Sequence, residues 1–301
     1  MSGGERAWLA ASGLAPVLIL AAVWLLLSRM SQWSTSPGVP DGYERFDAER
    51  FTVYCAPENR KAAKALVDEA GQFAMRTAEA FSPLLGDLTP PDDPIQVTLF
   101  GNQKDFATFA SSALSEDLSQ NGGYFDVVNL EIAVVMTDSA GTRLGIRHEV
   151  AHLLLARDGG RRGSTLPPWL NEGLATYLEV ADPNAPNDPP DIAQWVAKIA
   201  AQTPTAPPIP TITESVQDAF IEAGNEVAYA HANLLVHFLI ARDADRFWRF
   251  ARQSRDGAAD TFAETFGSPD QLAAPWEHFV RSAGTSAADP SRRRKAYTNP
   301  I

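Results

Sequence analysis

Two histidines and a glutamate have the residue types and the spacing of a metal site. His148 and His152 lie four residues apart in the run His148-Glu149-Val150-Ala151-His152. On an α-helix such residues share a face, offset by about 40° and by ~6 Å along the axis. Two imidazoles placed in this way can bind one Zn²⁺. Glu149 can hold a water at the metal without being a ligand itself.

Glu172 is the natural third ligand. A zinc site that does chemistry needs three protein ligands and one open position. Glu172 follows His152 after nineteen intervening residues, just behind Pro167 and Pro168, which open a second helical pattern. The structural alternative is a buried helix that carries two histidines by chance, and it leaves the carboxylate on the second helix unexplained.

Strand and helix patterns alternate ahead of the histidine helix, and helical patterns dominate behind the second one. This order predicts an α+β or α/β half followed by helices. Strands are expected at 50–55, 95–100 and in runs within 123–136, and helices at about 58–81, 104–114, 192–201, 225–241, 243–254, 258–266 and 270–282. The corresponding parts are a sheet-bearing lobe with the zinc-site helices at 43–180, a helical lobe at 181–284 and a tail at 285–301.

The N-terminus has the pattern of a membrane anchor. Residues 7–27 carry no charge, and a helix of that length spans a hydrocarbon core. The sequence predicts an anchor at 1–30 and a linker at 31–42 that is rich in Ser, Pro and Gly. An uncleaved anchor is favoured over a signal peptide because no cleavage site follows. We expect a single-pass membrane protein whose catalytic domain is extracytoplasmic.

Composition excludes some function classes. The formal net charge is −12, which argues against a nucleic-acid partner. The basic run 292–295 has the character of a solvated tail. Cys55 is the single cysteine, so an intrachain disulfide is excluded, and we interpret this residue as part of the core.

The two motifs together resemble those of the gluzincin metallopeptidases. The resemblance rests on His148-Glu149-x-x-His152 and on Asn171-Glu172-Gly173, and it extends over about 142–180. The most similar group is the peptidase-MA-like domain of bacterial membrane-linked proteins. The resemblance implies a zincin-like α+β fold, with a small twisted sheet packed on the metal-site helix and a helical lobe closing a cleft. It also implies one Zn²⁺ held by His148, His152 and Glu172, with Glu149 as general base.

A later helix could supply a catalytic donor. In this clan a tyrosine often stabilises the oxyanion, and Tyr229 has the matching place in the chain; a packed tyrosine is the plainer alternative. His231 is a rival donor, but on an ideal helix it lies ~200° around from Tyr229, so both cannot face the metal. Where thermolysin-like members carry an acid that orients the first histidine, this chain has Thr176, a weaker partner.

Other polar residues are weaker candidates. His237 and His278 lie among apolar residues and are interpreted as core or surface histidines, and Asn171 is expected to bond to the backbone at the helix start. The arginines near the metal helix either balance charge or meet a substrate carboxylate; they are Arg143, Arg147, Arg157, Arg161 and Arg162.

The expected function is that of a zinc metallopeptidase acting on a peptide or protein. The run upstream of the histidines, 129–136, contains nothing like the amine-gripping stretch of the clan's aminopeptidases, so an endopeptidase is favoured. Residues around 123–136 could pair with an extended peptide. Two alternatives stay open: a zinc-containing binding module without activity, and a zinc amide hydrolase that acts on a non-protein substrate. The presence of Glu149 argues against the first, because a structural zinc site has no use for it.

Overall fold

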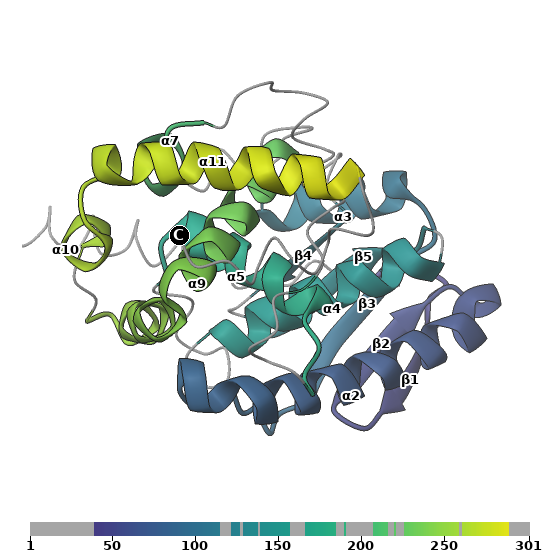
Figure 1. Cartoon of the computed structure of the whole chain (residues 1–301). Coiled ribbons are helices and arrows are strands. Elements are labelled where there is room, and N and C mark those ends of the chain that lie inside the picture. Colours follow the sequence, from purple (N-terminus) through teal and green to yellow (C-terminus); the bar gives the residue numbers. More distant parts are fainter. Residues whose placement is uncertain are drawn as a thin grey trace, which may run out of the picture.

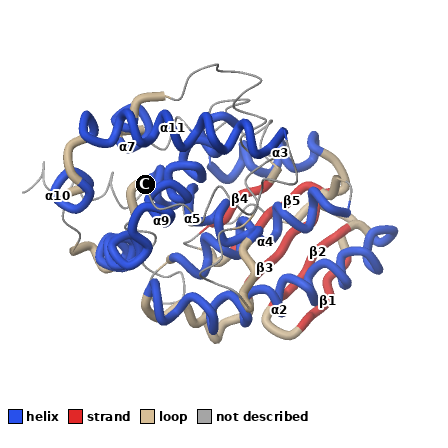
Figure 2. The backbone as a smooth tube through the Cα atoms, in the orientation of Figure 1, coloured by secondary structure: helices blue, strands red, loops and turns tan. Residues whose placement is uncertain are grey.

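The chain forms an α+β fold in which one mixed sheet is flanked by helices and joined to a helical layer (Figures 1 and 2). The computed structural model describes residues 39–114, 122–126, 129–137, 139–156, 166–184, 190, 207–215, 220, 226–258 and 261–288.

The sheet has five strands in the order β1-β2-β3-β5-β4. Its three inner strands run parallel, and the two outer strands, β1 and β4, run antiparallel to their neighbours. The strands are β1 (Glu44–Ala48), β2 (Phe51–Cys55), β3 (Ile95–Phe100), β4 (Gly123–Asp126) and β5 (Glu131–Val135).

Alternation of side chains divides the sheet into two covered faces. Val97 and Leu99 point into the main core beneath α2 (Arg60–Leu85) and α4 (Ser139–Leu155). Phe100 joins a second cluster, under α3 (Gln103–Leu114) on the opposite face. A short 3₁₀ turn, η1 (Pro57–Asn59), leads from β2 into α2. The metal helix α4 therefore packs directly against the sheet.

The remaining helices form the second layer, and the main core runs through it without interruption. They are α5 (Pro168–Val180), α7 (Ile209–Thr213), α9 (Glu226–Arg255), α10 (Phe262–Phe266) and α11 (Pro269–Ala288). The backbone of α9 leaves helical geometry at Asp243 (φ −163°, ψ 89°), whose carboxylate then accepts a hydrogen bond from the Arg246 amide at 3.0 Å. The predicted break between 241 and 243 is confirmed.

Most predicted elements are present, with shifted ends. The strands at 50–55 and 95–100 are confirmed, and the helix predicted at 58–81 begins at Arg60 and continues to Leu85. Strand β1 was not predicted, because its sequence Glu44-Arg-Phe-Asp-Ala48 is mostly charged. The helix predicted at 192–201 lies outside the described residues.

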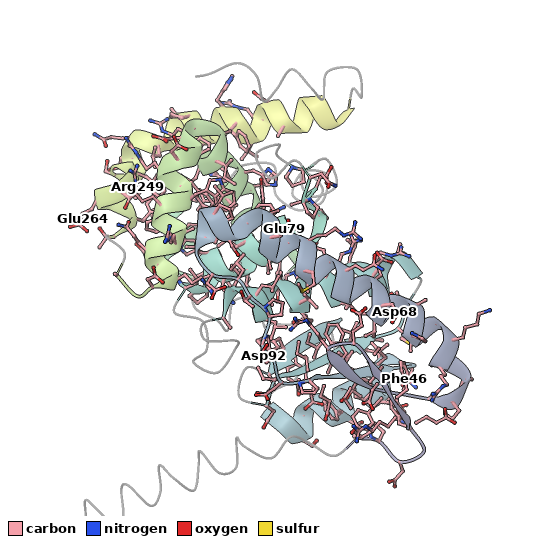
Figure 3. All side chains as sticks on the ribbon, turned by 90° about the horizontal axis from the view of Figure 1, so that it is seen from below. Phe46, Asp68, Glu79, Asp92, Arg249 and Glu264 are labelled. Carbon is pink, nitrogen blue, oxygen red and sulfur yellow. The ribbon has the colours of Figure 1, made fainter. Side chains whose placement is uncertain are left out.

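The predicted membrane span is not part of the fold that the structure describes. Residues 7–27, to which the pattern assigns it, lie outside the described residues. None of the described helices is sufficiently long and apolar to cross a membrane. The long helix α2, for example, carries exposed charges such as Glu79 (Figure 3). The fold class is therefore corrected to an α+β fold whose described helices include none that could span a membrane, and the predicted single-pass, extracytoplasmic localisation is withdrawn.

Arg255 joins the helical layer to the sheet layer. Its buried guanidinium donates hydrogen bonds to the carbonyls of Leu85 and Asp87 at the end of α2, at 3.4 and 2.6 Å. It also donates to Leu155 at 3.0 Å and Ala156 at 3.2 Å, at the end of α4. The last carbonyls of a helix have no partner within the helix, and a cation there interacts favourably with the helix dipole. One side chain thus caps two helices.

We predict that Arg255→Met destabilises the protein by about 3 kcal/mol, because it leaves several buried carbonyls without a donor. Urea unfolding measures the change. Arg249→Met, at an exposed arginine of the same helix (Figure 3), is the matched control and is expected to change stability by less than about 0.5 kcal/mol. Equal midpoints for the two variants would contradict the assigned role of Arg255.

His237 makes stability depend on pH. It is 1% exposed, and its ring lies 5.0 Å from that of Tyr177. Burial lowers its pKa to about 3. Below about pH 6.5 the unfolded chain binds a proton that the folded state does not, so stability falls by about 1.4 kcal/mol per pH unit down to the folded pKa.

We therefore expect His237→Leu to weaken this dependence. Between pH about 7 and about 5.5, the wild type should lose about 1.4 kcal/mol more stability than the variant, measured by urea unfolding at each pH. The same loss in both proteins would show that the histidine is protonated inside the fold.

Candidate metal centre

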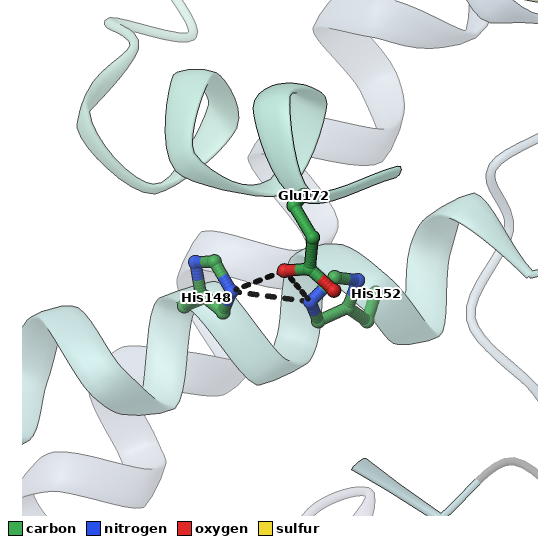
Figure 4. Close-up of side chains that lie close together, drawn as sticks. All are labelled: His148, His152 and Glu172. Atoms are coloured by element: carbon green, nitrogen blue, oxygen red, sulfur yellow. Dashed lines mark hydrogen bonds and ion pairs between the residues drawn. The ribbon is translucent and has the colours of Figure 1, made fainter. Parts of the chain in front are cut away.

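His148, His152 and Glu172 converge between α4 and α5 (Figure 4). The Nε2 atoms of the two histidines lie 3.1 Å apart. The Oε2 atom of Glu172 lies 3.4 Å from Nε2 of His148 and 3.2 Å from Nε2 of His152. The side chains of all three residues are at most 15% exposed. The structure thus brings together the three residues that the sequence predicts as ligands.

The size of this triangle fits a zinc ion. With Zn–N and Zn–O bonds of about 2.0–2.1 Å, neighbouring donors of a tetrahedral site lie roughly 3.3–3.4 Å apart. The three observed distances are close to that value. Two imidazole nitrogens and a carboxylate oxygen are also a donor set that zinc favours, with one corner of the tetrahedron left free. The residues present therefore fit the expected ion.

Helix packing fixes the triangle. The apolar residues of α4 between and beyond the histidines, Val150, Leu153 and Leu154, are buried. Helix α5 starts at Pro168, and Gly173 lies where it crosses α9: a Cβ there would come within 2.8 Å of the Ala232 carbonyl oxygen. Glycine at this position allows the two helices to approach closely, which holds Glu172 above the histidines.

A second carboxylate orients the first histidine. Nδ1 of His148 lies 2.9 Å from Oε2 of Glu179. A proton donated from Nδ1 leaves the lone pair of Nε2 directed toward the other donors. The sequence predicts Thr176 in this place, and this prediction is wrong, since the hydroxyl of Thr176 has no hydrogen-bond partner among the described residues. The missed signal was the spacing of seven residues, two helical turns, between Glu172 and Glu179.

The pKa shifts of His148 and Glu172 both favour positive charge at the imidazole and negative charge at the carboxylate. Burial opposes the charged form of His148, but hydrogen bonds to Glu172 and Glu179 outweigh it and raise its pKa well above the usual value. Burial likewise opposes the charge of Glu172, but the charge of His152 and the hydrogen bonds from both histidines lower its pKa. The carboxylates of Glu172 and Glu179 thus favour positive charge at His148, where a metal cation would be held.

The predicted general base lies beside the triad. Glu149 is 6% exposed, and burial, opposed by the two histidines, raises the pKa of its carboxyl. Its Oε1 atom lies against Gly123 of β4. A base that is more basic than an ordinary carboxylate and close to a metal site is suited to accept a proton near neutral pH.

Tyr229, rather than His231, faces the site. The ring centroids of Tyr229 and His148 are 6.0 Å apart. Burial and the charges of Glu172 and Glu149 raise the pKa of Tyr229, so its hydroxyl stays protonated and can donate. Burial alone lowers the pKa of His231 to about 4, without a contribution from either carboxylate.

None of the other described candidates belongs to the triad. Arg143 and Arg147 bond to Glu69 at 2.7 and 2.6 Å, which is the charge-balancing role. His278 is exposed, and Oδ1 of Asn171 has no hydrogen-bond partner among the described residues, so the backbone bond expected of Asn171 through this oxygen is not found. Arg157, Arg161 and Arg162 lie outside the described residues.

Comparison of the whole chain with models of protein families gives no match, and no curated protein sequence matches it. Evidence for a function therefore comes from the geometry of the site.

We predict that Glu179→Gln weakens zinc affinity by about tenfold or more, because it removes the charge that orients His148. Competition with a chromophoric chelator measures the affinity. Thr176→Val, on the same face of α5, is the matched control and should leave the affinity unchanged. An equal loss in both variants would show that Glu179 has no special role.

Proposed function

We propose that the protein is a zinc-dependent peptidase, and an endopeptidase in preference to an aminopeptidase. The observation that supports this most is the buried triangle of His148, His152 and Glu172, with Glu149 next to it. A site that serves only stability uses its metal with all positions closed. Here the described residues supply three donors, which leaves a position open, and a buried carboxylate of raised pKa lies alongside.

The residues of the chain divide the chemistry among them. Zinc, when bound, would polarise a carbonyl and acidify water. Glu149 accepts the proton of the attacking water and returns it to the nitrogen that leaves. The Tyr229 hydroxyl donates a hydrogen bond to the oxygen on which negative charge develops. Glu149 is buried and Tyr229 is partly buried, which strengthens these interactions because water screens them less.

The edge strand β4 offers a place for an extended substrate. The amide of Val135 donates to the Gly122 carbonyl at 2.8 Å, so alternation of an antiparallel ladder turns the backbone groups of Gly123 and Phe125 away from β5. Their N–H and C=O groups face the outer side of β4, on which the described residues place no further strand, and can pair with a peptide. The opposite edge, β1, carries exposed charges, which oppose strand addition.

We predict that Glu149→Gln lowers kcat by about 10³-fold, because it removes the proton acceptor and leaves the ligands in place. A digest of a peptide library by the full chain measures activity, and elemental analysis measures zinc. The variant should keep one zinc per chain. Full activity of the variant would exclude Glu149 as the base, and a zinc-loaded wild type that cleaves nothing would favour the binding module.

A further inference from the structure

Gly123 of β4 lies where no side chain fits. A Cβ at this position would lie 2.9 Å from the carbonyl oxygen of Ala133, 3.0 Å from Oε1 of Glu149 and 3.1 Å from Cγ2 of Val134. Two of these three contacts cannot give way easily. The Ala133 oxygen belongs to the backbone of the buried strand β5, and Val134 is 1% exposed.

The third contact is with the general base itself. Glu149 projects from α4 toward the sheet and is almost fully buried, so few rotamers are open to it. Its carboxylate lies close enough to the bare backbone of Gly123 to leave no space for a methyl group. The backbone of β4 at Gly123 thus limits where the carboxylate of Glu149 can lie.

We propose that Gly123 is a positioning residue, which sets the place of the Glu149 carboxylate through the closeness of β4. This inference rests on the proposed function. The backbone groups of the same residue face the free edge where a peptide would pair. The backbone of β4 around Gly123 therefore positions both the substrate and the base. It thereby sets the distance between the scissile bond and the proton acceptor.

The neighbouring glycine gives a matched control. A Cβ on Gly122 would meet nothing within 4 Å. Gly123→Ala is expected to lower kcat by about 10- to 100-fold, since a displacement of about 1 Å has that effect on a reacting group. KM should change by less than about threefold, and zinc content should stay at one per chain. Gly122→Ala should retain wild-type kcat. If both variants keep wild-type kcat, or if only KM rises, the proposal fails.

A stability measurement tests the same contact without any activity. Gly123→Ala should lower the thermal midpoint, and shortening the base with Glu149→Asp should recover part of that loss in the double variant, because the carboxylate then withdraws from the added methyl. If Gly123→Ala does not fold alone, recovery of soluble protein in the Glu149→Asp background serves as the readout. If the losses in thermal midpoint of the two single variants simply add in the double variant, the added methyl clashes only with the sheet and not with Glu149. This result would overturn the proposal. An inactive wild type that shows the recovery would refute the peptidase and leave the contact intact.

Discussion

Three electron-pair donors within 3.4 Å of one another, on side chains that are at most 15% exposed, are the constraint on which the rest of this molecule depends. Such a group is stable only when a cation or shared protons lie among the donors. The fold supplies the means to hold it. Glu179 orients the imidazole of His148 through its Nδ1 atom, and the sheet supports α4. The close crossing of α5 and α9 at Gly173 keeps the carboxylate of Glu172 in place.

The sequence was sufficient to predict those parts of the candidate site whose geometry is set within a single helix. His148 and His152 belong to one helix, so their separation alone defines their relation. Glu172 required the recognition of a second motif. Glu179 was missed because the expected spacing was one turn from Glu172, whereas the structure uses two turns. The choice between Tyr229 and His231 depends on the rotation of α9, which is set by tertiary packing and not by any local pattern.

The fold could likewise be predicted in part from the sequence. Apolar alternation located β3, and the helical pattern with a break near 242 located both segments of α9. Strand β1 escaped detection because its place at the edge allows charged residues, which erase the alternating pattern. The pairing order of the strands could not be foreseen, since it places β5 beside β3 and leaves β4, earlier in the chain, outermost.

Helix α9 meets the metal helix at two distant points. Tyr229, near the start of α9, lies beside His148. Arg255, at the end of α9, donates hydrogen bonds to the last carbonyls of α4 and α2. Tyr229 and Arg255 lie on opposite sides of the break in α9 at Asp243, so the two contacts come from different helical segments. The donor of the site and the cap of α4 are therefore carried by parts of α9 that do not form one straight helix.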